Sequence, residues 1–199
     1  MQKTILSLED VTKTYIMGEI KVEALKKTTL DIYEGELVVI LGPSGSGKST
    51  LLNIIGGMDT VTSGKIKFNN IDLSEANDNL LTKYRREEVG FVFQFYNLIS
   101  DLTGRENVEL AAVLVDKPAD LDTVLEDVGL VDRMNHFPAQ MSGGEQQRVS
   151  VARAIVKKPK LLLCDEPTGA LDYETGKKIL TLLKKVNEET ACTVLLITH

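Results

Sequence analysis

Cysteine is scarce in this sequence: two, Cys164 and Cys192, occur in 199 residues. Both lie in apolar runs, LLLCDE and ACTVLLIT, and no CxxC pair or histidine cluster accompanies them. Two cysteines alone are too few to form a structural zinc site. We therefore expect two buried thiols in a protein that works in a reducing compartment.

Long hydrophobic runs are absent as well. No apolar stretch reaches the roughly 18 residues that a membrane-spanning helix needs. The opening segment MQKTILSLED contains no apolar signal-peptide core. These features predict a cytoplasmic protein that depends on another protein for any attachment to a membrane.

Positive charge is not in excess, because the formal net charge is -6. A surface that holds nucleic acid by neutralising phosphates is usually basic, so the charge disfavours a nucleic-acid partner. Hydrophobic residues make up 43% and charged residues 26% of the chain, as in ordinary globular proteins. A chain of this length is sufficient for one domain with a real core.

The pattern of apolar residues predicts an α/β core. Strand-like segments fill the N-terminal third, and a short apolar run at 36–41 leads into a glycine-rich loop and a helix-like stretch. Two more apolar runs, at 160–164 and 193–198, are typical of strands covered on both faces of a parallel sheet. Helical spacing marks 175–189 and most of 96–155, so we interpret the latter as a helical insertion.

The glycine-rich loop, GPSGSGKST, matches the phosphate-binding pattern GxxxxGK[ST]. Its glycines allow successive backbone N–H groups to point at one anion, and the following helix adds its positive N-terminal end. Lys48 would supply a cation for the β- and γ-phosphates, and the Ser49 hydroxyl could ligate Mg²⁺. The predicted nucleotide-binding residues of this loop are Gly42, Ser44, Gly45, Ser46, Gly47, Lys48, Ser49 and Thr50.

Two adjacent carboxylates, Asp165 and Glu166, follow the apolar run LLLC. Beside a phosphate loop, Asp165 would hold Mg²⁺ and Glu166 would act as general base for the attacking water. Alone, such a pair could equally be solvated loop residues. The presence of Lys48 and Ser49 favours the catalytic interpretation.

Between these two motifs lies MSGGEQQR, residues 141–148, which strongly resembles the signature motif of the ABC (ATP-binding cassette) ATPases. The following run, VSVARAIVKKPKLLLCDEPTGALD, continues in that family's motif order. The wording of the motifs is similar to the subgroup that serves macrolide export, lipoprotein release, cell division and antimicrobial-peptide resistance.

The resemblance implies an α/β P-loop NTPase fold with a mainly parallel sheet, an N-terminal antiparallel β subdomain and an inserted helical subdomain. It implies one ABC ATPase domain over 1–199, with the nucleotide-binding core at 1–95 and 156–199 and the helical subdomain, which carries the signature, at 96–155. It also implies Mg²⁺ as cofactor and two ATP molecules held between two head-to-tail copies of the chain. In that arrangement the nucleotide held by one chain's phosphate loop contacts the other chain's Ser142, Gly143, Gly144 and Glu145.

Four further positions match the family's motifs one at a time. Tyr15 matches the aromatic residue that stacks on adenine. Gln94 matches a glutamine that reaches Mg²⁺ and the attacking water. Asp172 matches an aspartate that crosses the dimer interface near the nucleotide, although it could also be a helix N-cap. His199 matches a histidine that contacts the γ-phosphate and orients the catalytic water.

The sequence departs from the family pattern in places. Met141 and Glu145 replace the usual leucine and glutamine of the signature, and Met for Leu is a conservative packing change. The helical insertion is short between Val113 and Asp120. Family members normally continue for some tens of residues beyond the position of His199, so we expect apolar surface of the core to be uncovered.

Several functions are compatible with these motifs. The first is an ATPase that drives a transporter, in the direction of export or extraction, through a membrane-spanning permease encoded separately. The second is an ATPase that signals mechanically to a membrane partner without moving a substrate. A soluble ABC protein of DNA repair or translation is disfavoured, because the chain has neither a long coiled coil nor a second cassette. A metabolite kinase would leave the signature motif unexplained.

Overall fold

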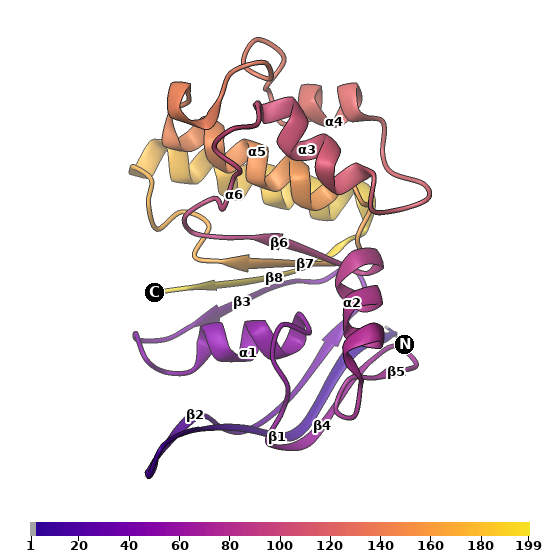
Figure 1. Cartoon of the computed structure of the whole chain (residues 1–199), viewed down its shortest axis with the longest axis vertical. Helices are drawn as coiled ribbons and strands as arrows, with labels where there is room; N and C mark the ends of the chain where they lie inside the picture. Colours follow the sequence, from indigo (N-terminus) through magenta and orange to yellow (C-terminus); the bar gives the residue numbers. More distant parts are fainter. Residues whose placement is uncertain (1–2) are drawn as a thin grey trace.

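Two β-sheets with helices between them and on one outer side make up the fold. The computed structural model describes residues 3–199. Figure 1 shows the layers in order: the helices α3 to α6, then a parallel sheet, then helix α1, then an antiparallel sheet. The bounds of these elements follow below.

The parallel sheet is built from short apolar strands in the order β3-β8-β7-β6. These strands are β3 (Leu37–Leu41), β6 (Val89–Val92), β7 (Leu161–Asp165) and β8 (Thr193–Thr198). Because the strands run parallel, their carboxyl ends share one edge of the sheet. The segments that follow β3, β7 and β8 therefore meet at this edge, where ligands of open α/β sheets bind.

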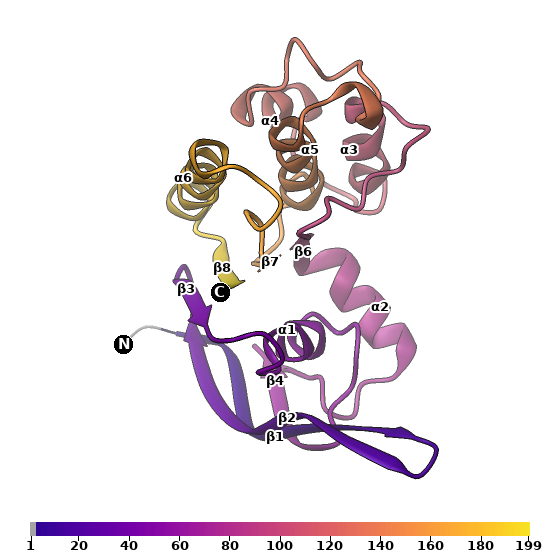
Figure 2. The same cartoon turned by 90° about the vertical axis from the view of Figure 1, so that its left-hand side faces the viewer.

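The antiparallel sheet has the order β2-β1-β4-β5. Its strands are β1 (Thr4–Met17), β2 (Ile20–Tyr33), β4 (Ser63–Phe68) and β5 (Ile71–Asp72). The turn between β1 and β2 contains Gly18 with a φ of 63°, a conformation that favours glycine. Figure 2 shows that this hairpin projects beyond the rest of the molecule.

Helices pack on both faces of the parallel sheet and bury its apolar side chains. They are α1 (Lys48–Ile55), α2 (Asp78–Glu87), α3 (Gly104–Ala112), α4 (Leu121–Asp127), α5 (Gly143–Ile155) and α6 (Tyr173–Thr190), with a short 3₁₀ turn at Pro138–Gln140. Helix α1 lies between the two sheets, whereas α5 and α6 lie on the opposite face of the parallel sheet (Figure 1). Each face of that sheet therefore contributes to a separate hydrophobic core.

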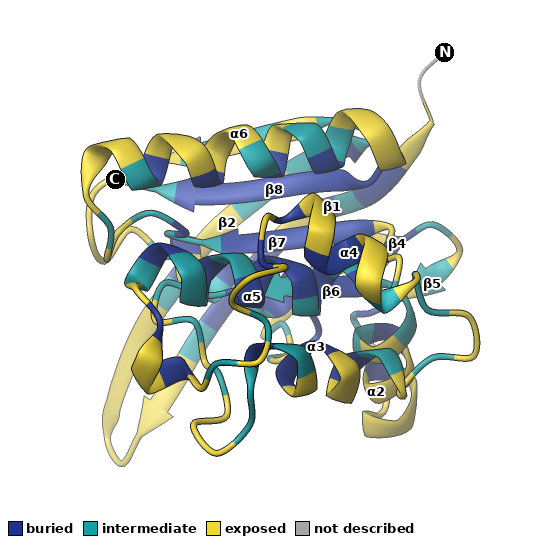
Figure 3. Cartoon of the chain, turned by 90° about the horizontal axis from the view of Figure 1, so that it is seen from above, coloured by how far each residue is buried: buried dark blue, intermediate teal, exposed yellow. Residues whose placement is uncertain are grey.

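Burial follows this layering. Strands β7 and β8 are almost entirely buried, whereas the outward face of α6 and the tip of the β1–β2 hairpin are exposed (Figure 3). The edge strand β3 alternates, with Leu37, Val39 and Leu41 exposed. No helix among residues 3–199 is both long and apolar enough to cross a membrane.

The predicted fold class is confirmed: an α/β core with a parallel sheet, an antiparallel N-terminal sheet and inserted helices. Both cysteines are buried free thiols, as predicted, and burial raises the pKa of the Cys192 thiol to about 12. Residues 113–120 contain no helix. The proposed boundaries of the helical subdomain at 96 and 155 stay a prediction.

Helix α2 and strand β6 were not predicted from the sequence. Helix α2 is polar, and only Leu81 and Tyr84 in it are buried. Strand β6 has four residues, too few for a periodic pattern. Its position is fixed by parallel pairing with β7, which a one-dimensional pattern does not reveal.

Candidate functional site

The phosphate loop joins the end of β3 to the start of α1. Gly45 and Gly47 adopt φ angles of 76° and 92°, which side chains rarely allow. A Cβ on Gly47 would also lie 2.5 Å from the carbonyl oxygen of Ala24. The loop can therefore close tightly over an anion only with glycine at these positions.

Lys48 lies inside this loop, with only 8% of its surface exposed. Its Nζ donates hydrogen bonds to the carbonyl oxygens of Gly42 at 2.6 Å and Pro43 at 2.9 Å. The ammonium group is thus held by carbonyl groups of the loop at the N-terminus of α1. Exchanging a carbonyl for a phosphate oxygen would give a stronger, charge-assisted bond.

A cavity of about 310 Å³ opens above the loop. It brings together the phosphate loop, the β2 segment Val22–Ala24, and two side chains from the carboxyl ends of β7 and β8, Glu166 and His199. The loop residues that line it are Ser44, Gly45, Gly47, Lys48, Ser49 and Thr50. Segments far apart in the sequence therefore converge on one concave site large enough to hold phosphate groups.

The two adjacent carboxylates have different surroundings. Asp165 ends β7, and its Oδ1 accepts a hydrogen bond from Ser49 Oγ at 3.4 Å. Glu166 turns away with a φ of 44°, while its amide N–H donates to the carbonyl oxygen of Ile197 at 3.0 Å. The Asp165 carboxylate therefore lies against Ser49 of helix α1, and the Glu166 carboxylate lies in the cavity.

Glu166 and His199 form a pair within the cavity. Nε2 of His199 lies 2.6 Å from Oε1 of Glu166, and the Glu166 side chain is 19% exposed. This contact fixes the orientation of the carboxylate. A carboxylate held at the mouth of a phosphate-binding cavity has the position that a general base for water requires.

The electrostatics of Asp165 suit a cation. Burial, and then the negative charge of Glu166, raise the pKa of the Asp165 carboxyl, against the opposing effects of Ser49 and Lys48. An ionised carboxylate that is partly desolvated and next to a second one is stabilised by a bound cation. The donor set of Ser49 and Asp165 therefore fits Mg²⁺, which proteins bind through one or two carboxylates together with phosphate oxygens.

The signature motif opens helix α5. Ser142 is the N-cap, and its Oγ and amide both donate to Oε2 of Glu145, at 2.9 and 2.7 Å. Nε of Arg133 lies 3.2 Å from Oε1 of the same carboxylate. The hydrogen bond from the Ser142 amide, helped by Arg133, holds the pKa of Glu145 below its ordinary value despite burial. The negative charge of Glu145 is thus engaged within its own chain.

The two glycines of the motif allow close packing. A Cβ on Gly143 would lie 2.7 Å from the Tyr96 hydroxyl oxygen, and one on Gly144 would lie 2.5 Å from Cγ2 of Thr175. None of the signature residues lines the cavity at the phosphate loop. Within one chain, the two halves of the expected site are therefore separate.

Family comparison agrees with this geometry. A profile of the ABC transporter family matches residues 25–169, which is most of the chain. This chain belongs to the ABC transporter family. It is an ABC ATPase domain, as the motifs predicted.

Relatives of this ABC ATPase include an uncharacterised ABC transporter ATP-binding protein of Methanocaldococcus jannaschii, MJ0796. The alignment with that protein is 204 residues long at 50% identity, and it covers 98% of this chain and 87% of the relative. The macrolide export ATP-binding/permease protein MacB of Escherichia coli K12 is 43% identical over 98% of this chain but only 31% of its own length.

Solved structures are similar as well. A dimeric structure of a post-hydrolysis state of MJ0796 bound to ADP and Pi has a TM-score of 0.89 at 49% identity, covering 98% of this chain and 88% of that one. The structure of cbiO1 from Clostridium perfringens, part of the ABC transporter complex cbiONQ, has a TM-score of 0.86 at 31% identity. It covers all of this chain and 79% of the other.

Several predicted site residues of the ABC ATPase do not line the cavity, among them Gln94, Asp172 and Tyr15. The Gln94 side chain packs on Gly169, where a Cβ would lie 2.7 Å from its Nε2. Asp172 is the N-cap of α6 and accepts a hydrogen bond from the Thr175 amide at 3.1 Å. Tyr15 is 37% exposed on β1 and donates a hydrogen bond to Asp59. Their roles toward the nucleotide stay predictions.

Gln147, within the signature helix, carries no sequence signal of its own. It is fully buried, and its Nε2 donates to the carbonyl oxygens of Phe93 at 3.3 Å and Pro167 at 2.9 Å. It therefore ties α5 to the loops that carry Gln94 and Glu166. Only the tertiary structure reveals this link, because its partners are 54 and 20 residues away in the sequence.

Proposed function

We propose that this ABC ATPase binds MgATP at the phosphate-loop cavity and hydrolyses it in a homodimer of two head-to-tail chains. The convergence of Lys48, Ser49, Glu166 and His199 on one cavity is the observation that carries the proposal. The separation of the signature motif from that cavity supports a site completed by a second copy. The dimeric structures of MJ0796, one with ADP and Pi, support the same arrangement.

The residues would divide the chemistry as follows. Lys48 leaves its loop carbonyls and pairs with the β- and γ-phosphate oxygens, while the loop amides hold the phosphates in place. Glu166 accepts the proton of the attacking water, and His199 holds that carboxylate in position. When bound, Mg²⁺ would be held by Ser49, Asp165 and Gln94 and would neutralise charge on the phosphates.

The remaining family residues would contact the nucleotide from other sides. Tyr15 stacks on the base, and the partner copy's signature residues Ser142 to Glu145 contact the γ-phosphate through the N-terminus of α5. Asp172, exposed at the start of α6, lies at the interface between the two chains. Loss of the γ-phosphate then removes contacts between the chains, so that hydrolysis shifts the population from closed to open dimers.

The work done by this cycle is proposed to drive a membrane permease in the direction of export or extraction. Relatives named as macrolide export ATP-binding/permease proteins support that direction. The permease is proposed to be a separate chain, because this chain covers 87% of a relative named only as an ATP-binding protein. The ATPase would then lie on the cytoplasmic face of the membrane. Co-purification with a permease from solubilised membranes tests this part.

The central experiment replaces the proposed base, Glu166→Gln. Because the amide cannot accept the proton, we expect ATP hydrolysis to fall by about 10²–10⁴-fold while ATP binding persists. Light scattering after gel filtration should show a dimer of this variant with ATP and monomers with ADP. Glu188→Gln, an exposed glutamate on α6, is the matched control and should behave like wild type.

Two outcomes would contradict the proposal. Undiminished hydrolysis by Glu166→Gln would place the general base elsewhere. A variant that binds ATP yet stays monomeric would remove the support for a shared site.

A further inference from the structure

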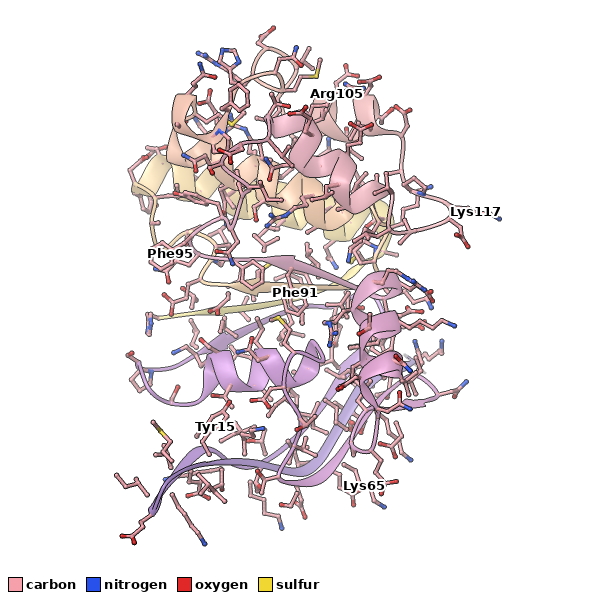
Figure 4. The ribbon with its side chains drawn as sticks, viewed as in Figure 1. Tyr15, Lys65, Phe91, Phe95, Arg105 and Lys117 are labelled. Carbon is pink, nitrogen blue, oxygen red and sulfur yellow. The ribbon has the colours of Figure 1, made fainter. Side chains whose placement is uncertain are left out.

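Tyr15 is held by an ion pair that the catalytic motifs do not include. Figure 4 shows Tyr15 between strand β1 and helix α1. Lys13, two residues earlier on β1, lies on the same face of the strand. Asp59 comes from the turn between α1 and β4. Three side chains from two segments therefore meet beside the phosphate-loop helix.

The hydrogen bonds of this cluster are complete around Asp59. Its Oδ1 accepts from Lys13 Nζ and from the Thr60 amide at 2.7 Å, and its Oδ2 accepts from the Tyr15 hydroxyl at 2.5 Å. Lys13 Nζ donates further to the Thr60 carbonyl oxygen at 2.6 Å. The Lys13 and Asp59 side chains are only 11% and 25% exposed.

A partly buried ion pair is by itself a weak source of stability, because desolvation offsets the attraction. Its geometric effect is larger, since it fixes the groups that it binds. Here it holds the Tyr15 ring at two points. The hydroxyl is tied to Asp59, and the Lys13 ammonium lies 5.0 Å from the ring centroid, in the range of a cation–π contact.

The charge states preserve this arrangement. The hydrogen bond to Asp59, then burial, raise the pKa of the Tyr15 phenol, and the Thr50 side chain opposes them. Burial alone would raise the pKa of Asp59, but the bonds from Lys13 and Tyr15 prevail and lower it. The phenol therefore remains a donor and the carboxylate an acceptor around neutral pH.

The same contacts position the Tyr15 ring relative to the phosphate loop. Thr50, whose side chain acts to lower the pKa of the Tyr15 phenol, lines the cavity and belongs to α1. The turn that carries Asp59 follows α1 directly. The ring is 37% exposed, so it remains accessible to a ligand.

We propose that Asp59 and Lys13 are positioning residues that hold the Tyr15 ring as a preformed stacking platform for the purine base of the bound nucleotide. This inference rests on the proposed stacking role of Tyr15. A ring already fixed in its binding orientation loses little freedom when the base stacks on it, so affinity for the base rises. Neither residue contacts the reacting atoms, and each acts only through Tyr15.

The test compares binding of ATP with binding of inorganic tripolyphosphate, which has no base, by calorimetry on the full chain. Tyr15→Ala should weaken ATP binding about tenfold, within the range for loss of one base–aromatic stack, and leave tripolyphosphate binding unchanged. Asp59→Ala should weaken ATP binding about threefold, again without affecting tripolyphosphate, because the ring is then free to turn.

Combined variants separate positioning from an independent effect. In the Tyr15→Ala background, Asp59→Ala should add nothing, since residues that act through one group are not additive. In the otherwise wild-type chain, Asp59→Ala should raise the KM for ATP hydrolysis and leave kcat unchanged. Asp122→Ala, which breaks the ion pair between Arg105 on α3 and the exposed Asp122 on α4, is the matched control.

Folding is a separate concern, because Asp59→Ala leaves the Lys13 charge unpaired. Tyr15→Phe avoids this unpaired charge, because it removes only the hydroxyl and keeps the ion pair. It should also weaken ATP binding.

If Tyr15→Ala weakens ATP binding but Tyr15→Phe and Asp59→Ala do not, the positioning inference is wrong and the stacking role stands. If Asp59→Ala weakens both ligands equally, it is also wrong. If Tyr15→Ala itself has no effect, the stacking role falls as well.

Discussion

At Asp165 and Glu166, one backbone angle separates two carboxylates that the sequence places side by side. The left-handed conformation of Glu166 directs its side chain to His199, while Asp165 stays in the strand beside Ser49. Such conformations are costly for residues with side chains and concentrate at functional sites. The two acidic groups can therefore have different chemical tasks.

Asp165 is expected to reduce the stability of the metal-free protein. Its pKa is raised in the folded state, so the ionised form is disfavoured there, and folding is weakened at pH values above that pKa. Asp165→Asn should therefore raise the melting temperature at neutral pH without Mg²⁺ or nucleotide, while ATP hydrolysis is lost. The gain should shrink as the pH is lowered toward the raised pKa of Asp165, because the wild-type carboxyl then takes up a proton.

Thermal unfolding of wild type and of Asp165→Asn, at neutral pH and at lower pH, measures the difference in melting temperature. A variant that is less stable than wild type at neutral pH would show that the hydrogen bond from Ser49 outweighs the burial and repulsion.

Helix α1 packs closely against the parallel sheet at its C-terminus. A Cβ on Gly56, at the C-terminus of α1, would lie 2.0 Å from Cζ of Phe91 and 3.0 Å from Cδ1 of Leu163. The helix thus rests directly on the parallel sheet. This close approach sets how far the phosphate loop, at the other end of α1, lies from β7 and its acidic residues.

Gly56→Ala should therefore destabilise the protein by about 1–3 kcal/mol, the usual cost of overpacking. Phe91→Leu in the same chain frees the space that the new methyl group needs. We expect the double variant to be less destabilised than the sum of the two single variants, because the residues share one contact. Urea unfolding of the four proteins provides the cycle. Strict additivity would mean that the clash is relieved elsewhere.

For the whole molecule, the consequential feature is the separation of the signature helix from the phosphate cavity. In a head-to-tail dimer, each site takes its phosphate loop from one chain and its signature from the other. A chain with Lys48→Ala has a defective phosphate loop and an intact signature. A chain with Ser142→Ala has an intact phosphate loop and lacks the signature hydroxyl. A mixed dimer of the two then contains one intact site.

Mixing these two variants should consequently restore ATP hydrolysis that neither shows alone, to about a quarter of wild type for random pairing of equal amounts. Phosphate release against mixing ratio, with the maximum expected at equal amounts, is the measurement. No gain on mixing, with dimers still present, would contradict the shared site. Lys48→Ala mixed with wild type serves as control for simple dilution.

Features that depend on neighbouring residues can be predicted from the amino-acid sequence. The glycines of the phosphate loop and the apolar runs of β7 and β8 could be predicted directly. Each is encoded within a few residues, because backbone conformation and strand burial are local or periodic properties. From these motifs the fold class and family followed.

The tertiary structure alone decided which distant residues touch. Parallel pairing of β7 and β8 brings Glu166 to His199, and the turn after α1 brings Asp59 to Lys13 and Tyr15. Contacts of this kind join segments that are tens of residues apart, and they depend on strand order and helix placement. No periodicity in the sequence records them, which is why α2, β6 and the Asp59 cluster became visible only in the folded chain.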